Sequence, residues 1–521
     1  MAEILTLNNL YKKVNSLKAK GKIVCHCHGC FDLVHYGHLN YFEASKSFGD
    51  ILIVTITPDK FIKKGPGRPV FDEKKRLKFL SELKTIDYVA LNNKADAVEL
   101  LKMLKPNFTF RGKEYEDYKK DLTGKILLEK NAIESSGGEL KIIDEETFSS
   151  TNLINQGNID FLSPEQSDFI SLIRRKKIPK KTLTFLDSIQ NKKILNIGEI
   201  IIDEYVYTSV RGTVTKHPII SASFIDEIKM AGGVLATSRH LNSMIKNPEL
   251  ITTYGNENIE YLKFIKKSLA PSIKPFMFKN NGDYTVVKRR FISSSGYPNP
   301  LSDSLNETSE RNSENRLFEI GYIPRGLIEI KTEEKILNFL KKKIKSYDLV
   351  IVSDFGHGLM TKKIIKEVQK SRKLAINTQT NSTNFGFNLL GKYSKSNFLC
   401  IDELEARLYM IDKNSSINGL GKKIMKKFNR SELMITRGKF GLVYFKDNKI
   451  FKAPGLATKV VDPIGAGDAL YTGAALASSF QKDPLVTVLL SSIMGMLGTS
   501  IEGNERGISR NEIIRSIKGL I

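Results

Sequence analysis

The chain of 521 residues has no tryptophan, only four cysteines and only seven histidines, and its acidic residues are outnumbered by basic ones. Four cysteines in so long a chain do not make the disulfide framework of a small secreted protein. The first residues, Met1, Ala2 and Glu3, lack the basic segment and the apolar core of a secretory signal. These absences predict a cytoplasmic protein.

Long apolar runs are also scarce. The stretch 484–501 carries no charge and has about the minimum length of a membrane span. Its serine, threonine and glycine residues make it too polar for a spanning helix. The sequence therefore predicts a buried helix at 484–501, with no membrane segment and no membrane partner.

The deficit of acidic residues leaves a net charge of +24, from 81 lysines and arginines against 57 aspartates and glutamates. Such a charge would suit a nucleic-acid-binding protein, but the lysines are spread along the whole chain and no nucleic-acid-binding motif accompanies them. Solvated helix faces, or polyanionic small substrates such as nucleoside triphosphates, account for a basic chain equally well. We expect no nucleic-acid partner, and the sequence leaves a homo-oligomer open.

Apolar runs of strand length alternate with helical patterns after a short amphipathic helix expected within residues 1–20. The expected strands are 51–56, 88–91, 108–110 and 140–143, and the expected helices are 72–83, 95–104 and 126–136. This alternation predicts a doubly wound, Rossmann-like α/β domain. Because the chain is too long for one core, we expect a first domain at 1–155, a linker at 156–190 and a second α/β domain at 191–521.

The segment from Gly29 to His38 combines a glycine, two histidines three residues apart and the start of a helical pattern. A strand, a glycine-bearing turn and a helix start together point backbone N–H groups at an anion. The imidazoles of His35 and His38 can donate hydrogen bonds to phosphoryl oxygens. The segment predicts a binding site for the α-phosphate of a nucleotide.

Around this segment the sequence resembles the cytidylyltransferase-like nucleotidyltransferases, whose signature G-x-F-D-x-x-H-x-G-H and late S-S-T both occur. It is similar in particular to the adenylyltransferase half of the bifunctional heptose kinase/adenylyltransferases. The resemblance implies transfer of a nucleoside monophosphate from ATP or CTP to a phosphate oxygen of a sugar or polyol phosphate, with release of pyrophosphate. Positioning and charge stabilisation suffice for such a reaction.

The same resemblance implies roles for individual residues. His35 and His38 would hydrogen-bond the phosphates and Lys46 would neutralise developing charge, so these three are the expected catalytic residues. Gly29 would let the backbone approach the nucleotide. The remaining residues expected to bind nucleotide or phosphate are Phe31, Arg68, Arg76, Ser150 and Thr151.

The run Cys-His-Cys-His-Gly-Cys at 25–30 suggests a second interpretation, a structural metal site. Against it, neighbouring residues of a strand point to opposite faces, and no second ligand pair follows at zinc-finger spacing. We therefore expect strand residues at this position, with no bound metal.

A second candidate site lies at 461–469, where a glycine-rich turn precedes a helix of small residues. The backbone N–H groups of Gly465, Ala466 and Gly467 would form an anion hole. Asp468 is placed to take a proton from an attacking hydroxyl. With the flanking glycine motifs, the stretch from about residue 194 to the end resembles the ribokinase-like (PfkB-type) sugar kinases.

This resemblance implies a ribokinase-like α/β domain that phosphorylates a sugar with ATP and Mg²⁺, with Asp468 as the catalytic base. The other implied residues are Asp203, Gly232 and Gly233 for the sugar, Thr436 and Gly438 for the nucleotide, and Glu403, indirectly, for the metal.

The chain departs from the sugar kinases at four places. Ala236 and Cys400 stand where the family has asparagine, Glu199 stands where it has aspartate, and Asn377-Thr378-Gln379 replaces its D-P-K. Two hypotheses stay open. Either the chain is a bifunctional enzyme of nucleotide-activated sugar synthesis with its domains in reversed order, or it is an active nucleotidyltransferase with a degenerate, regulatory or ligand-binding kinase-like domain.

Overall fold

The computed structural model describes residues 2–62, 68–112, 125–143, 162–214, 219–255, 259–281, 283–294, 314–428, 432–458 and 460–521. The chain divides into two compact units, which we call unit 1 (Met1–Ser167 with Ile514–Ile521) and unit 2 (Asp168–Ile513). The domain limits expected at residues 155 and 190 stay a prediction.

Unit 1 contains a parallel six-stranded sheet in the order β1-β4-β3-β2-β5-β6. Its strands are β1 (Glu3–Leu5), β2 (Val24–Gly29), β3 (Ile51–Ile56), β4 (Tyr88–Leu91), β5 (Phe108–Gly112) and β6 (Glu139–Ile143). Its helices are α1 (Leu7–Ala19), α2 (Tyr36–Lys46), α3 (Glu73–Ser81), α4 (Val98–Leu104), α5 (Lys125–Glu134) and the 3-10 helix η1 (Asp59–Phe61). The doubly wound α/β prediction is confirmed, but the sequence did not predict β1, which precedes α1.

Successive side chains along the strands of unit 1 point to opposite faces of the sheet, and a hydrophobic core lies on each face. Cys25 and Cys27 face one side of β2 and pack with Phe42 of α2 and Leu80 of α3. Val24 and Ile53 belong to the other core, together with side chains of α1 and α4. Helices therefore cover both faces of the sheet, as a parallel sheet requires.

Unit 2 is built on a nine-stranded sheet in the order β11-β10-β7-β14-β15-β16-β17-β18-β19, parallel up to β17 and antiparallel beyond it. Its strands are β7 (Ile194–Gly198), β10 (Glu249–Tyr254), β11 (Lys274–Lys279), β14 (Leu349–Asp354), β15 (Leu374–Thr378), β16 (Phe398–Asp402), β17 (Glu432–Thr436), β18 (Leu442–Lys446) and β19 (Lys449–Ala453).

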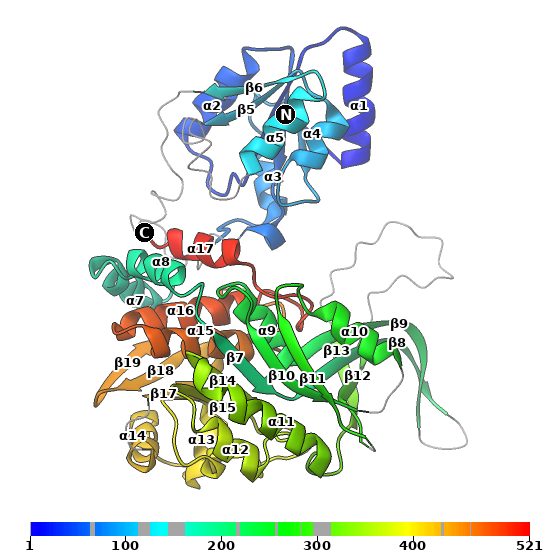
Figure 1. The fold of residues 1–521 in the computed structure, drawn as a ribbon. Coiled ribbons are helices and arrows are strands. Elements are labelled where there is room, and N and C mark those ends of the chain that lie inside the picture. Colours follow the sequence, from blue (N-terminus) through cyan, green and yellow to red (C-terminus); the bar gives the residue numbers. More distant parts are fainter. Residues whose placement is uncertain are drawn as a thin grey trace. The chain divides into compact units, whose positions relative to one another are not determined.

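Helices cover both faces of this sheet as well, with α11 to α13 on one side and α15 and α16 on the other (Figure 1). The helices of unit 2 are α8 (Ile178–Ser188), α9 (Val234–Asn242), α10 (Ile259–Ser268), α11 (Ile330–Lys343), α12 (Lys362–Val368), α13 (Glu403–Met410), α14 (Ile417–Lys427), α15 (Ala466–Phe480) and α16 (Pro484–Gly498), with 3-10 helices η4 (Ile344–Ser346), η5 (Leu390–Lys392) and η6 (Gly438–Phe440). Two further helices, α7 (Pro164–Arg175) and α17 (Arg510–Lys518), include residues of both units.

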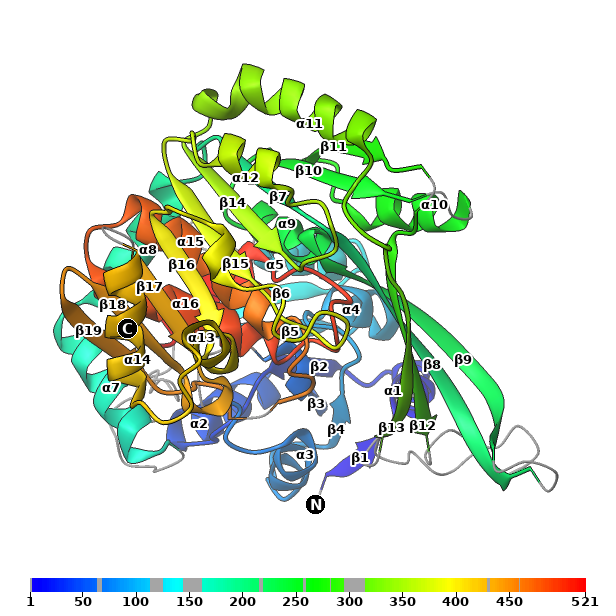
Figure 2. The ribbon, with the colours of Figure 1, turned by 90° about the horizontal axis from the view of Figure 1, so that it is seen from below.

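A four-stranded sheet of order β13-β12-β8-β9 projects from the main body of unit 2 (Figure 2). Its strands are β8 (Ile200–Thr213), β9 (Ile220–Gly233), β12 (Val286–Ser294) and β13 (Glu314–Tyr322). The inner ends of β8 and β9 are buried, and the outer end of β8 is exposed.

The uncharged stretch at 484–501 forms α16, most of whose side chains are buried, as expected. Among the described residues, none of the helices is both long enough and apolar enough to cross a membrane.

Candidate functional sites

The first candidate site lies where β2 ends and α2 begins. The chain runs from β2 outward through β3 and β4, and then crosses to the other side of β2 to form β5. In a doubly wound sheet, ligands bind at the carboxyl ends of the strands where the order reverses. Gly29 ends β2, and His35 is the residue that precedes α2. The strand order thus places the Gly29–His38 segment at the position where a nucleotide would bind.

The two histidines of this segment lie against each other. The His35 backbone N–H donates to His38 Nδ1 at 3.3 Å, and the ring centroids are 4.1 Å apart. Both ring nitrogens of His35 are buried, and neither has a hydrogen-bond partner among the described residues. Burial also lowers the pKa of His35. A buried imidazole without a partner is costly unless a ligand completes its hydrogen bonds.

Phe31 and Gly29 set the shape of the turn. Phe31 has a φ of 45°, and its ring packs edge-on against His38 with a centroid distance of 5.4 Å. A Cβ at Gly29 would lie 2.9 Å from Phe31 Cζ. The structure therefore gives Gly29 a packing reason to be glycine, because the Phe31 ring occupies the space beside it.

The two arginines expected at the phosphates differ in how they are held. Arg68 Nε pairs with Asp32 Oδ2 at 2.5 Å, and its Nη2 is buried without a partner among the described residues. Arg76 is 2% exposed and donates to the carbonyl oxygens of Cys30, Thr57 and Phe71, and to Asp59 Oδ1. Arg68 thus keeps an N–H for a ligand, whereas Arg76 braces the loops after β2 and β3.

Lys46 is not brought to the histidines. It ends α2, and its ammonium pairs with Asp87 Oδ2 at 2.5 Å and donates to the Asp50 carbonyl oxygen. These partners precede β4 and β3, so Lys46 lies at the amino ends of the strands, the edge opposite His35. The expected role of Lys46 at the phosphates therefore disagrees with its position. Ser150 and Thr151 lie outside the described residues.

The Cys/His run belongs to the sheet, as expected. Cys25 and Cys27 are buried in one core, while His26 and His28 point to the opposite face. There, His26 Nε2 and His28 Nδ1 each lie 2.9 Å from Thr55 Oγ1. In the part of the chain that the structure describes, no cluster of His, Cys, Asp or Glu could hold a metal ion.

The second candidate site lies at the start of α15. Gly465 precedes the helix with a φ of 81°, and a Cβ there would lie 2.1 Å from Asn504 Oδ1. Both the backbone angle and the neighbouring amide thus require glycine. Asp468 lies in the first turn, where the helix dipole favours negative charge.

Asp468 has the electrostatics of a proton acceptor. Its residue is 8% exposed, and burial raises the pKa of Asp468 to about 7. Gln379 Nε2 donates to Asp468 Oδ1 at 3.0 Å, which opposes the rise, and the charge of Asp203 adds to it. A general base is most effective when its pKa lies near the working pH.

Two of the expected sugar-binding residues, Asp203 and Gly232, come together, and the charge of Asp203 acts on Asp468. β8 pairs with β9 so that Gly232 faces Ile201, and a Cβ at Gly232 would lie 2.5 Å from Asp203 Oδ2. Gly233, with a φ of 60°, precedes α9. However, Arg290 Nη1 already pairs with Asp203 Oδ1 at 2.5 Å.

Two basic residues of β12 were missed by the sequence interpretation. Arg290 pairs with Asp203, and Lys288 lies in register with Asp203 on the adjacent strand. Burial lowers the pKa of Lys288, although the charges of Asp203, Glu319 and Asp468 oppose this. The signal was the basic run at 288–290 within an apolar strand, but without the strand order nothing connects it to Asp203.

A cavity of about 370 Å³ brings the expected nucleotide residues together. Thr436 and Gly438 line it from the end of β17, and Ala466 and Gly467 line it from the start of α15. Apolar side chains, among them Leu442, complete the wall. The cavity is of the size and polarity of a small-ligand site.

Glu403 does not fit its expected place in a metal network. Its Oε1 accepts from Arg407 at 2.6 Å and its Oε2 accepts from Arg437 at 2.8 Å. These arginines lower the pKa of Glu403, Arg437 most. With both oxygens engaged, Glu403 fixes the loop after β17 to α13.

The substituted positions are also engaged. Glu199 accepts hydrogen bonds from the backbone N–H groups of Phe355 and His357, and burial together with Asp354 raises the pKa of Glu199 to about 7. Asn377 Nδ2 donates to the Cys400 carbonyl oxygen at 2.8 Å. Of the substituted side chains, Glu199 and Asn377 thus have structural partners within unit 2.

Two family models match the chain, each over one unit. Residues 26–156 match the cytidylyltransferase-like family, and residues 324–489 match the pfkB family of carbohydrate kinases. Neither match extends over half of the chain. The fold is therefore a Rossmann-like nucleotidyltransferase fold in unit 1 and a ribokinase-like α/β fold in unit 2.

Sequence relatives match the nucleotidyltransferase region of unit 1. The chain is 34% identical over 161 residues to the bifunctional protein HldE of Geobacter metallireducens. The aligned residues make up 30% of this chain and 31% of that protein. It is 36% identical over 142 residues to HldE of Trichlorobacter lovleyi, 27% and 28% of the two chains. The aligned part thus spans less than a third of these relatives' length.

Solved structures resemble a larger part of the chain at low identity. Phosphofructokinase-2 from Escherichia coli in complex with fructose-6-phosphate has a TM-score of 0.48 and 10% identity, over 64% of this chain and 99% of that one. The nucleoside kinase of Methanocaldococcus jannaschii has a TM-score of 0.43 and 16% identity, over 63% and 99%.

Proposed function

We propose that the chain is a bifunctional enzyme of nucleotide-activated sugar synthesis. Unit 1 transfers a nucleoside monophosphate from ATP or CTP to a sugar or polyol phosphate and releases pyrophosphate. Unit 2 phosphorylates a sugar with ATP. The observation that carries the proposal is that, among the described residues, both ring nitrogens of His35 at the start of α2 lack a partner.

In unit 1, a phosphate oxygen of the acceptor attacks the α-phosphorus in line, and pyrophosphate leaves from the opposite side. His35 and His38 donate hydrogen bonds to the oxygens on which charge develops, and the α2 start adds its dipole. Arg68, held by Asp32, offers to a phosphate of the same nucleotide its Nη2, which has no partner in the part of the chain that the structure describes.

In unit 2, Asp468 removes the proton from the sugar hydroxyl as that oxygen attacks the γ-phosphorus. The backbone of Gly465 to Gly467 receives the transferring group, and Thr436 and Gly438 bind the nucleotide. Mg²⁺ is held mainly by substrate phosphates in such reactions, with one or two carboxylates. Since both oxygens of Glu403 are engaged by arginines, no part of this step is assigned to it.

The alternative, a kinase-like unit that binds a ligand without turnover, has specific support. Gln379 stands where the sugar kinases have lysine, and its amide contacts Asp468. Asp203 is paired with Arg290 and so is not free for a sugar hydroxyl.

The deciding experiment incubates the full chain with Mg²⁺, ATP or CTP, and a panel of sugar phosphates, and measures pyrophosphate release. A parallel incubation with ATP and unphosphorylated sugars measures ADP formation. Pyrophosphate and ADP formation together support the bifunctional enzyme. Pyrophosphate without ADP supports the alternative, and neither product with any substrate contradicts both.

A further inference from the structure

Unit 2 contains a second cavity, of about 660 Å³, that the proposed reactions do not use. Gln190 and Lys246, which line it, precede β7 and β10, so the cavity lies at the amino ends of parallel strands. Asp354 and Gln379 mark the opposite edge, because they end β14 and follow β15. The volume is typical of a site for a small molecule.

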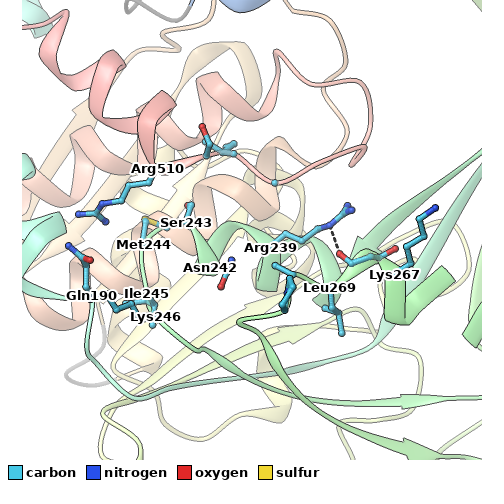
Figure 3. A pocket seen from close by; sticks show the side chains of 16 residues that line it. Gln190, Arg239, Asn242, Ser243, Met244, Ile245, Lys246, Lys267, Leu269 and Arg510 are labelled. Carbon is cyan, nitrogen blue, oxygen red and sulfur yellow. Dashed lines mark hydrogen bonds between the residues drawn. The ribbon is translucent and has the colours of Figure 1, made fainter. Parts of the chain in front are cut away.

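The charged residues that line this cavity all have one sign. Four of its sixteen lining residues are cationic and none is Asp or Glu; the four are Arg239, Lys246, Lys267 and Arg510. Figure 3 shows Arg510 and Gln190 at one end, Arg239 and Lys267 at the other, and Asn242 and Ser243 between them. Cations that line a small cavity favour an anionic occupant.

Both arginines are held in place from behind. Arg239 donates to the carbonyl oxygens of Ser268 and Asn504, each at 2.8 Å, and the first of these bonds is drawn in Figure 3. Arg510 Nη2 donates to the Leu186 carbonyl oxygen at 3.1 Å and to Asp187 Oδ1 at 2.7 Å. Fixed guanidinium groups lose little entropy when they bind an anionic oxygen.

Arg510 has unused capacity for such a bond. Its Nη1 is buried and has no hydrogen-bond partner among the described residues. The carboxylate of Asp187 is 73% exposed, so water screens its charge and it neutralises Arg510 only weakly. A guanidinium with one satisfied edge and one unpaired N–H is arranged to receive a phosphoryl oxygen.

The cavity is also connected to the start of α15. Arg239 holds the backbone of Asn504, and the Asn504 side chain lies against Gly465, where a Cβ would meet it at 2.1 Å. Gly465 precedes the helix that carries Asp468. An anion bound to Arg239 would draw on the charge that the guanidinium shares with the Asn504 carbonyl oxygen, and Asn504 would pass this change to the anion hole.

We propose that this cavity binds a small phosphorylated anion, and that its occupancy changes the start of α15 through Arg239 and Asn504. The anion is an effector rather than a substrate. The cavity is lined by no Asp, Glu or His that could serve as a general base, and it lies at the amino ends of the strands, opposite Asp468. The proposal does not depend on whether unit 2 phosphorylates a sugar.

The absence of tryptophan from the chain provides a local probe. Pro271 lines the cavity and is exposed, so Pro271→Trp places the only indole of the chain at the cavity. Inorganic pyrophosphate at constant ionic strength is expected to change its fluorescence in a saturable way. Replacing Lys246 and Lys267 by Ala in the same background should raise the Kd about tenfold or more.

Lys266→Ala is the matched control, because Lys266 is also exposed on the last turn of α10 but does not line the cavity. It should leave the Kd nearly unchanged. No saturable signal, or a signal that the Lys246/Lys267 variant retains at full affinity, would overturn the binding site.

Hydrogen exchange tests the connection in the wild-type chain. Saturating pyrophosphate should slow exchange of the amides at 465–469, and this protection should disappear in the Lys246/Lys267 variant, whose anion hole is intact. Protection that persists in the variant would show direct binding at α15, and unchanged exchange while the indole signal saturates would show no coupling. Either result overturns the effector role.

Discussion

The starts of α2 and α15 invite comparison, because each presents residues proposed to handle phosphate. At α2 the reactive groups are uncommitted: His35 has two ring nitrogens without partners in the described chain. At α15 the acid is already engaged, with Gln379 on Asp468 and Arg290 on the neighbouring Asp203. Among the described residues, His35 can meet a ligand without giving up a side-chain partner, whereas Asp203 would have to exchange its pair with Arg290 to bind a sugar hydroxyl.

The comparison shows that a retained motif does not by itself retain its electrostatics. Both helix starts keep the geometry of an anion site. In unit 2 the lysine of the sugar kinases is absent at Gln379, but Lys288 and Arg290 bring positive charge from β12 to the same region. Positive charge is thus supplied from a different strand, which is why the activity of unit 2 needs a direct test.

The largest effect is expected for Asp468→Asn. The amide keeps the hydrogen bond from Gln379 but cannot accept a proton, so ADP formation with a sugar should fall about 100- to 10,000-fold. Pyrophosphate release from unit 1 should be unchanged, and this second assay serves as the folding control. Residual ADP formation equal to the wild-type rate would remove Asp468 from the mechanism.

A somewhat smaller effect is expected for His35→Ala. Loss of one phosphate-binding donor should slow pyrophosphate release about 100- to 1000-fold, with ADP formation retained. Tyr36→Ala, at the neighbouring and 66% exposed residue, is the control and should retain the activity. If both activities fall together in a folded protein, the two sites are not independent.

The pH dependence of unit 2 should follow Asp468. Because the base must be ionised and burial raises the pKa of Asp468 to about 7, ADP formation should rise with pH around a midpoint of about 7 and level off above it. Gln379→Lys would put an ammonium group beside the carboxylate and should move this midpoint down by about one unit. A midpoint that does not move in the variant would mean that another group controls the profile.

Much of the fold could be predicted from the sequence because buried strands and helices leave periodic patterns. The strands at 51–56 and 88–91 have the expected limits. β1 was missed because three residues next to an amphipathic helix carry no pattern of their own. His35 could also be placed from the sequence, because its position depends only on the helix that directly follows it in the chain.

Residues whose partners lie far along the chain could not be placed in this way. Arg76 was expected at a phosphate, but its donors are taken by carbonyl groups of loops up to 46 residues away. The pairing of Arg290 with Asp203, 87 residues apart, depends on β12 lying beside β8. Spacing on a helix also misled the interpretation of Lys46, because a shared face does not mean a shared end of the helix.

The smallest effect is expected for Lys46→Met, which tests directly whether Lys46 acts at the phosphates. Eight residues of helix separate Lys46 from His38 by about 12 Å, and its ammonium pairs with Asp87, which also accepts from the Leu52 N–H. The side chains of Lys46 and Asp87 are 29% and 34% exposed, so losing this pair should cost no more than about 1 kcal/mol. The unfolding temperature should fall by a few degrees, while pyrophosphate release stays near the wild-type rate and Lys46→Arg restores the stability. The opposite result would be a loss of pyrophosphate release as large as that of His35→Ala, with the unfolding temperature unchanged. It would show that Lys46 acts on the phosphates after all.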